Sequence, residues 1–435
     1  MSNPDRFPLK DTAEVPERAL LVGVEWPGST WPLEETLAEL ERLAATAGAQ
    51  VVATTTQKMS SVNPKTFVGS GKADEIAQLC RIHNIDVVIF DDELSPSQQS
   101  NLERIVGKDV KVIDRTALIL DIFALHATTR EGRLQVRLAQ NQYLYPRLRG
   151  MWAHLASNRM GGGVGSRFGE GESQLEVDRR MVRNRMTAIK RELADLERTR
   201  NIQRHTRLQV PSVRVALAGY TNAGKSSLLN TLTGSDVLSY DKLFATLDST
   251  TRKLSLPEGR QITLTDTVGF IQKLPTTLVE AFKSTLDEIR EASIIVHVID
   301  ASSNNRQSQI DAVENVLEQI GAQDISRIEV FNKVDLLNPD QSEALQARYP
   351  SALLVSAHTG YGLDDLLARI ALVASAQDSL MSILLPYDKG NLRSLAHDSC
   401  MILNEEHTEN GTRLEMRVPP SLISRFEPYS LEQEH

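Results

Sequence analysis

Cysteine is scarce in this sequence, with only Cys80 and Cys400 among 435 residues. Neither cysteine has neighbours at metal-ligand spacing, so both are interpreted as buried thiols in a reducing compartment rather than as a disulfide or a zinc site. Long apolar runs are also missing. None approaches the roughly 20 residues that a transmembrane helix needs, and the start, MSNPDRFPLKD, lacks the apolar core of a signal peptide. We therefore expect a cytoplasmic protein.

The chain as a whole lacks an excess of positive charge, whereas its middle region is basic. The formal net charge is -9, yet residues 130–207 contain sixteen Arg and one Lys against eight acidic residues, or +9. A local basic stripe matters more for nucleic-acid contact than the total charge. Two interpretations stay open at this point: a solvated helical surface with ordinary arginine content, or a surface that contacts RNA.

The chain is too long for one ordinary core, and its pattern changes along its length. Residues 1–115 alternate apolar strand-like runs with helical patterns, which predicts an α/β domain with a mainly parallel sheet. Residues 116–210 predict a long antiparallel helical hairpin, 211–376 a second α/β domain with a mostly parallel sheet, and 377–435 a small α+β domain. Within the first domain, GSGK at 69–72 precedes a helix; it could bind phosphate, but we favour a plain turn and helix start.

The predicted hairpin has an apolar seam and a glycine-rich tip. In its second helix apolar residues recur every seven positions, at Leu175, Val182, Ile189 and Leu196. The loop MGGGVGSRFGEGES contains six glycines, which let a backbone approach another surface closely. A mere linker needs no arginine there, so we favour an RNA-contacting tip with four candidate residues: Arg159, Arg167, Arg179 and Arg180.

A nucleotide site is predicted where GYTNAGKSS follows the apolar strand VRVALA and precedes the helical SLLNTL, the context that a P-loop requires. In such a loop Gly219 and Gly224 allow backbone amides to surround the β-phosphate, Lys225 reaches the β- and γ-phosphates, and the Ser226 hydroxyl ligates Mg²⁺. The predicted phosphate-binding residues are Gly219, Tyr220, Thr221, Asn222, Ala223, Gly224, Lys225, Ser226 and Ser227.

Two further segments are predicted to sense the γ-phosphate. In FATLDSTTRKL a threonine must ligate Mg²⁺, and Thr246, Thr250 and Thr251 all qualify chemically. In DTVGF, Asp266 at a strand end would hold a water on Mg²⁺ and the Gly269 amide would bond the γ-phosphate. Cleavage of that phosphate would release both loops.

The NKVD sequence at 332–335 predicts guanine specificity. The Asp335 carboxylate can accept hydrogen bonds from guanine N1 and the 2-amino group, which adenine does not offer. Asn332 would tie this loop to the P-loop, and the Lys333 stem would cover the base. Ser356-Ala357 would supply a backbone amide for the guanine O6. We therefore predict a GTPase that binds GTP or GDP with Mg²⁺.

Two departures from the Ras-like pattern bear on catalysis. Phe270 stands where a glutamine would orient the attacking water. Since it cannot activate water, we expect slow turnover until an external partner orders the site. Asn222 resembles the asparagine with which some related GTPases ligate K⁺ between the phosphates; the alternative is that it only braces the loop.

With these motifs in place, the chain resembles the HflX family of ribosome-associated GTPases over about residues 19–376. The resemblance rests on VGSGKADEI, GGGVGSR, ESQLEVDRR, GYTNAGKSSLLNTL, FATLDSTTR, DTVGFIQKLP, NKVD and SA. It departs at RFGEGESQLE, where Gly-Pro-Gly is expected before the acidic residue. The resemblance selects Thr246 as the Mg²⁺ ligand beside Ser226 and Asp266. The residues predicted to act in hydrolysis are Lys225, Thr246, Gly269 and Asn222.

The resemblance also implies a partner, the large ribosomal subunit and its RNA, and a role in splitting stalled or idle ribosomes under stress. We expect a monomer that is cytoplasmic and in part ribosome- or membrane-associated. The alternatives are a GTPase of ribosome assembly or tRNA modification, and an N-terminal domain that remodels RNA with ATP, whose only support is Gly69 to Lys72.

Overall fold

The computed structural model describes residues 16–27, 31–157, 168–207, 213–234, 243–244, 248–273, 283–376 and 378–431. By its internal contacts the chain forms two compact units, one made of residues 1–122 and 146–176 and the other of residues 123–145 and 177–435. None of the helices among the described residues is long and apolar enough to cross a membrane. The predicted α/β class is confirmed in both units, whereas the domain boundaries at 115, 210 and 376 stay predictions.

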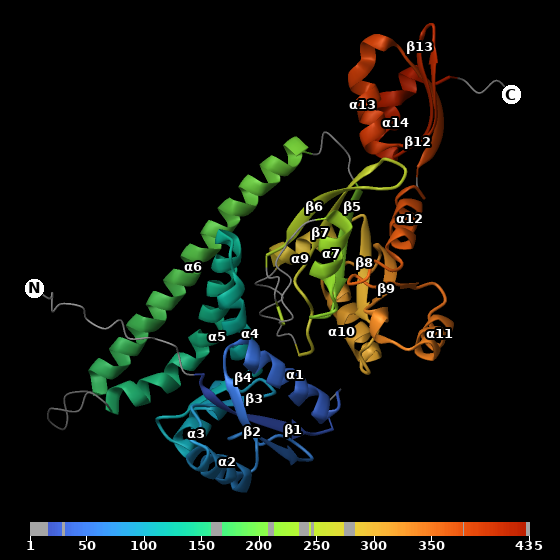
Figure 1. Cartoon of the computed structure of the whole chain (residues 1–435). Coiled ribbons are helices and arrows are strands. Elements are labelled where there is room, and N and C mark those ends of the chain that lie inside the picture. The colour runs from blue at the N-terminus through green and yellow to red at the C-terminus, as the bar shows by residue number, and fades with distance from the viewer. Residues whose placement is uncertain are drawn as a thin grey trace, which may run out of the picture. The chain divides into compact units, whose positions relative to one another are not determined.

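The first unit contains a four-stranded parallel sheet in the order β2-β1-β3-β4 (Figure 1). Its core is formed where apolar residues of these strands meet the amphipathic helices, and Leu20, Val88 and Ile76 are completely buried. The elements are β1 (Arg18–Glu25), α1 (Leu33–Thr46), β2 (Gln50–Lys58), α2 (Ser70–Ile82), β3 (Val87–Phe90), α3 (Pro96–Val106), β4 (Lys111–Asp114) and α4 (Arg115–His126).

The GSGK segment forms a helix start, as we favoured. Gly69 is the residue before α2, and its amide donates to the side chain of Gln57 over 2.9 Å. The Lys72 ammonium group is bound to Glu75 and Thr55, which also lowers the pKa of the Glu75 carboxyl. The amide and the lysine that would receive a phosphate are thus already engaged within the protein.

Two long helices follow, α5 (Arg130–Ser157) and α6 (Phe168–Arg207). Arg130 of α5 pairs with Glu192 of α6, and Arg183 of α6 donates to the Tyr145 hydroxyl, so these parts of the two helices run antiparallel. The predicted seam is buried at Ile189, which packs with Leu134, Leu138, Met186, Leu193 and Leu196. Residues 160–167 of the predicted tip lie outside the described residues, whereas residues 168–173, which we had predicted as loop, form the start of α6.

The helical pattern that begins at Thr116, the first half of the predicted hairpin, forms two helices in the structure. It breaks after α4, and α5 begins at Arg130. The cause is a contact distant in sequence: the Asp248 carboxylate accepts hydrogen bonds from the amides and the hydroxyls of Thr128 and Thr129. A carboxylate at this position satisfies the free amides at the start of α5.

The nucleotide-binding motifs lie on a six-stranded sheet with the order β10-β9-β8-β5-β7-β6, parallel except for β6. Its strands are β5 (Val213–Gly219), β6 (Thr250–Ser255), β7 (Gln261–Asp266), β8 (Ile294–Asp300), β9 (Ser326–Asn332) and β10 (Leu353–Leu354). Its helices are α7 (Lys225–Thr233), α9 (Lys283–Arg290), α10 (Arg306–Gln319), α11 (Pro339–Arg348) and α12 (Leu363–Ala374). Figure 1 shows the strands of this sheet side by side with helices around them.

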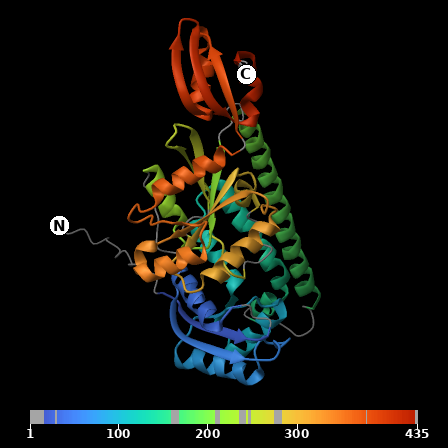
Figure 2. The same ribbon diagram turned by 90° about the vertical axis from the view of Figure 1, so that its right-hand side faces the viewer.

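The C-terminal segment forms a three-stranded antiparallel sheet in the order β11-β13-β12, seen in red in Figure 2. Its elements are β11 (Ser379–Leu385), α13 (Gly390–Ser399), β12 (Met401–Thr408), β13 (Gly411–Val418) and α14 (Ile423–Phe426). The α+β prediction is confirmed. Within this segment the sequence had indicated only two strands, which correspond to the paired strands β12 and β13. The strand β11 was missed although its SLMSILL run is apolar.

Candidate functional site

The P-loop connects the end of β5 to the start of α7. Its two glycines are required by close backbone approach: a Cβ atom on Gly219 would lie 2.2 Å from the Val298 carbonyl oxygen. Gly224 has a φ of +92° and would place a Cβ atom 2.2 Å from Asn332 Nδ2. Any other residue at either position would displace the loop or its neighbour.

Lys225 lies inside this loop rather than on the surface. Its ammonium group donates to the carbonyls of Gly219 at 3.1 Å and Tyr220 at 2.9 Å, and the residue is 6% exposed. Burial lowers the pKa of Lys225 from 10.5 to about 8, although the nearby Asp266 carboxylate favours the charged form. A buried cation enclosed by backbone carbonyls is a suitable binding partner for phosphate oxygens.

A hydroxyl and a carboxylate meet beside this lysine. Ser226 Oγ donates to Asp266 Oδ2 over 2.6 Å, and Asp266 is completely buried at the end of β7. Oxygen ligands of this kind are the donors that Mg²⁺ prefers, and Mg²⁺ keeps several waters when only one or two protein ligands are offered. The residues present therefore fit the ion that was predicted from the sequence.

The DTVGF segment is hydrogen-bonded directly to the P-loop. The Thr221 amide donates to the Phe270 carbonyl at 2.7 Å, and the Phe270 amide donates to the Gly219 carbonyl at 3.1 Å. The Tyr220 hydroxyl accepts from the Gln272 amide at 2.8 Å. The Phe270 side chain is 1% exposed and apolar, so it offers no group that could bind water.

The predicted guanine loop is joined to the P-loop through Asn332. Its side chain donates to the Ala223 carbonyl and accepts from the Ala357 amide, each over 2.9 Å. The Asp335 carboxylate accepts a hydrogen bond from the Ser356 hydroxyl at 2.6 Å and is exposed. The structure therefore brings the three motifs together at the carboxyl ends of β5, β7 and β9, where ligands bind in open α/β sheets.

The residues predicted to bind the guanine base or K⁺ include Ala357, Lys333 and Asn222. The Ala357 amide, which we expected to serve the guanine O6, donates to Asn332. Lys333 has a left-handed φ of 66°, and its ammonium group pairs with Asp300 at 2.7 Å. Asn222 is also left-handed, with a φ of 60°. Their assigned roles toward nucleotide and K⁺ stay predictions.

Three candidates, Thr246, Arg159 and Arg167, lie outside the described residues. Of the other two arginines, Arg180 is exposed on α6, whereas Arg179 is half-buried 5.9 Å from the centre of the Tyr145 ring.

Sequence reasoning missed three groups near the site. Asp300, the partner of Lys333, is a carboxylate at the end of the strand IIVHVID, and that position alone could have identified it. Asp248 and Gln272 carried no such signal, because their contacts and their burial depend on the tertiary structure.

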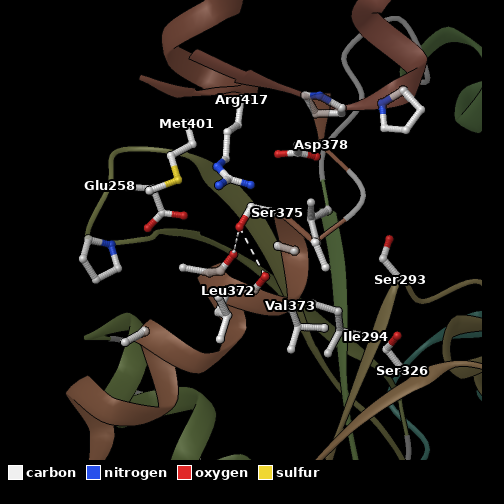
Figure 3. Close-up of a pocket in the computed structure, with 18 residues that line it drawn as sticks. Glu258, Ser293, Ile294, Ser326, Leu372, Val373, Ser375, Asp378, Met401 and Arg417 are labelled. Atoms are coloured by element: carbon white, nitrogen blue, oxygen red, sulfur yellow. Dashed lines mark hydrogen bonds between the residues drawn. The ribbon is translucent and has the colours of Figure 1, made fainter. Parts of the chain in front are cut away.

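One cavity among the described residues lies away from the nucleotide-binding motifs. A groove of about 1100 Å³ is lined by Ser293, Ser326, Arg417 and neighbouring residues (Figure 3). Ser293 and Ser326 precede or begin β8 and β9, so the groove lies at the amino ends of the parallel strands. The phosphate-binding motifs lie at the opposite ends.

Family models and a solved structure match the chain. Three family models match the chain: the N-terminal region of GTP-binding GTPases over residues 34–124, the middle region of such GTPases over 126–207, and a 50S ribosome-binding GTPase over 214–333. A crystal structure of a GTP-binding protein from Sulfolobus solfataricus in complex with GDP is 24% identical, with a TM-score of 0.42, and covers 82% of this chain and 98% of that one.

Curated relatives extend over nearly the whole chain. GTPase HflX of Caldanaerobacter subterraneus subsp. tengcongensis is 45% identical and covers 96% of this chain and 95% of its own length. GTPase HflX of Escherichia coli K12 is 42% identical and covers 88% and 90%, respectively. Because these relatives are more than 40% identical and cover most of the chain, the chain belongs to the HflX family of GTPases.

Proposed function

We propose that this GTPase binds the large ribosomal subunit and uses the GTP cycle to dissociate or rescue stalled or idle ribosomes. The observation that carries the proposal is the burial of Phe270 against the P-loop, which leaves this position without a group for water. We therefore expect a partner to raise the rate of hydrolysis. The match of residues 214–333 to a 50S ribosome-binding GTPase supports the ribosome as that partner.

The proposed nucleotide chemistry follows from the contacts of the site. Lys225 would exchange its two carbonyl partners for the β- and γ-phosphates of GTP, and the Asp335 carboxylate would select guanine. Ser226, Asp266 and Thr246 would hold Mg²⁺, which neutralises charge that develops on the phosphates. The Gly269 amide would donate a hydrogen bond to the γ-phosphate. Release of that phosphate after hydrolysis would free the segment that contains Phe270.

We also propose that Asn222 helps to bind K⁺ between the phosphates. Its position inside the loop supports this role, because an ion there would neutralise charge as an arginine does in other GTPases. Rates of hydrolysis measured in K⁺ and in Na⁺ at equal ionic strength test the idea. Faster turnover in K⁺ is expected, and equal rates would remove K⁺ from the mechanism.

The basic region at 130–207 is proposed to contact ribosomal RNA. Its net charge of +9 in an acidic chain supports this role, because arginines displace counterions from RNA phosphates.

The protein is proposed to be a monomer, since one copy contains all the predicted motifs.

A charge-reversal variant tests the ribosomal contact. Changing Arg159, Arg167, Arg179 and Arg180 to Glu should abolish co-sedimentation with large subunits while GDP affinity stays unchanged. The matched control changes four arginines exposed elsewhere on the chain to Glu: Arg42, Arg81, Arg369 and Arg425. Both variants change the net charge equally, so binding that survives in the first or is lost in the control would show that the basic region is not the contact.

A further inference from the structure

A buried hydroxyl group in the P-loop lacks a hydrogen-bond partner in the part of the chain that the structure describes. Thr221 is 6% exposed, and among the described residues its Oγ1 atom has no hydrogen-bond partner. The backbone of the same residue is engaged, because its amide donates to the Phe270 carbonyl over 2.7 Å. Buried polar groups are normally satisfied, and an exception calls for a ligand or water that the folded chain alone does not supply. The hydroxyl thus has free capacity for a bound group.

The position of this side chain is fixed by its neighbours. A Cβ atom added to Gly269 would lie 2.9 Å from Thr221 Cγ2 and 3.0 Å from Lys225 Nζ. The threonine side chain and the lysine ammonium group therefore both lie against the same glycine. In a P-loop GTPase the lysine binds the β- and γ-phosphates, and the amide of this glycine bonds the γ-phosphate. Thr221 consequently lies on the γ-phosphate side of the site.

The chemistry of a hydroxyl fits the role that Phe270 cannot fill. A threonine hydroxyl donates one hydrogen bond and accepts others, so it can contact a water and a phosphate oxygen together. We propose that Thr221 is a catalytic residue whose hydroxyl accepts a hydrogen bond from the attacking water and donates one to a γ-phosphate oxygen.

In the reaction, the water oxygen forms a bond to the γ-phosphorus. The bond from that phosphorus to the β–γ bridging oxygen breaks, and its electron pair stays on GDP. The proton of the water passes to a phosphate oxygen, and Thr221 begins and ends the reaction as a neutral hydroxyl. Its contribution is the alignment of the water, which is the main task of the protein in phosphoryl transfer.

Two substitutions separate the hydroxyl from the shape of the side chain. Thr221→Val keeps the branched shape and removes the hydroxyl, whereas Thr221→Ser keeps the hydroxyl and removes the methyl group. Hydrolysis is measured as a single turnover with excess protein, Mg²⁺ and K⁺ and without ribosomes, and the affinity for a fluorescent GDP analogue is measured in parallel. The assay depends on GTP hydrolysis alone, so its outcome is independent of the ribosomal proposal.

We expect Thr221→Val to slow hydrolysis at least about tenfold, Thr221→Ser to stay within about threefold of the unmodified protein, and both to bind GDP normally. A Thr221→Val protein that hydrolyses GTP at the original rate would overturn the proposal. So would an equal loss in both variants, because Thr221→Ser keeps the hydroxyl, or a loss of GDP affinity that accounts for the slower rate.

Discussion

Replacement of Asn332 by Ala should destabilise the GTPase fold and weaken nucleotide binding together. Asn332 is 2% exposed, and its side chain satisfies the Ala223 carbonyl and the Ala357 amide, each over 2.9 Å. The substitution leaves both backbone groups without this partner. Since each of the two buried groups left unsatisfied costs about 1–3 kcal/mol, we expect a loss of about 2–6 kcal/mol in the free energy of unfolding.

The effect is measured by thermal unfolding without nucleotide and by GDP titration. For a domain of this size 1 kcal/mol corresponds to roughly 2–4 °C, so the midpoint should fall by about 5–15 °C. GDP affinity should fall by at least about tenfold, because a 1.4 kcal/mol loss in the bound state already has that effect. Unfolding is compared in the same buffer and at the same protein concentration.

Asn338→Ala is the matched control. Asn338 is exposed, and its side chain accepts a hydrogen bond from the Gln341 amide at 2.8 Å, where α11 begins. Loss of such a cap costs about 1 kcal/mol and should not affect GDP affinity. If Asn332→Ala unfolds at the same temperature as Asn338→Ala and binds GDP normally, the reasoning about the bridge between the two loops is refuted.

Three further predictions concern single groups. Burial lowers the pKa of Lys225 to about 8, so the buried charged lysine destabilises the nucleotide-free protein below that pH. The free energy of unfolding should therefore increase as the pH rises from about 8 to 10.5. Because phosphates favour its charged form, GDP binding should take up a proton in that range, detectable by calorimetry in two buffers. Burial tends to raise the pKa of Asp248, but bonds from Thr129 and Thr128 lower it overall. Asp248→Ala should therefore speed amide exchange at both threonines at neutral pH, and the difference should vanish in acid below the folded pKa. Gln272 is 3% exposed, and among the described residues neither end of its side-chain amide has a partner. Gln272→Leu should thus raise the free energy of unfolding by about 1–3 kcal/mol in urea titrations without nucleotide, and a decrease would contradict the burial argument.

Much of the fold could be predicted from local patterns. The strands β1, β5 and β8 are apolar runs that end at turn residues or carboxylates, and the P-loop is a contiguous motif in which Gly219 and Gly224 have a fixed spacing. Asn332 was predicted to tie its loop to the P-loop, and the hydrogen bond to Ala223 has that geometry. These features depend on neighbours in sequence or on a fixed motif order.

The features that sequence reasoning missed depend on contacts distant along the chain. The break before α5 depends on Asp248, which is 120 residues from Thr128. The lack of a hydrogen-bond partner for the Thr221 hydroxyl among the described residues can be recognised only from the folded structure. Likewise, Gln272 follows Phe270 by two positions, but its burial gives no periodic signal in so short a segment. Tertiary contacts therefore decide the details of the site after the motifs have decided its location.

The most direct test of the account is GTP hydrolysis in K⁺ buffer, measured alone and with purified large ribosomal subunits. We predict slow hydrolysis by the isolated protein and a rise of about a hundredfold or more with subunits, which corresponds to about 2.7 kcal/mol in the barrier. Such a rise would mean that the ribosome completes a site that Phe270 leaves unfinished. A fast rate for the protein alone, with no stimulation by subunits, would contradict the proposed function.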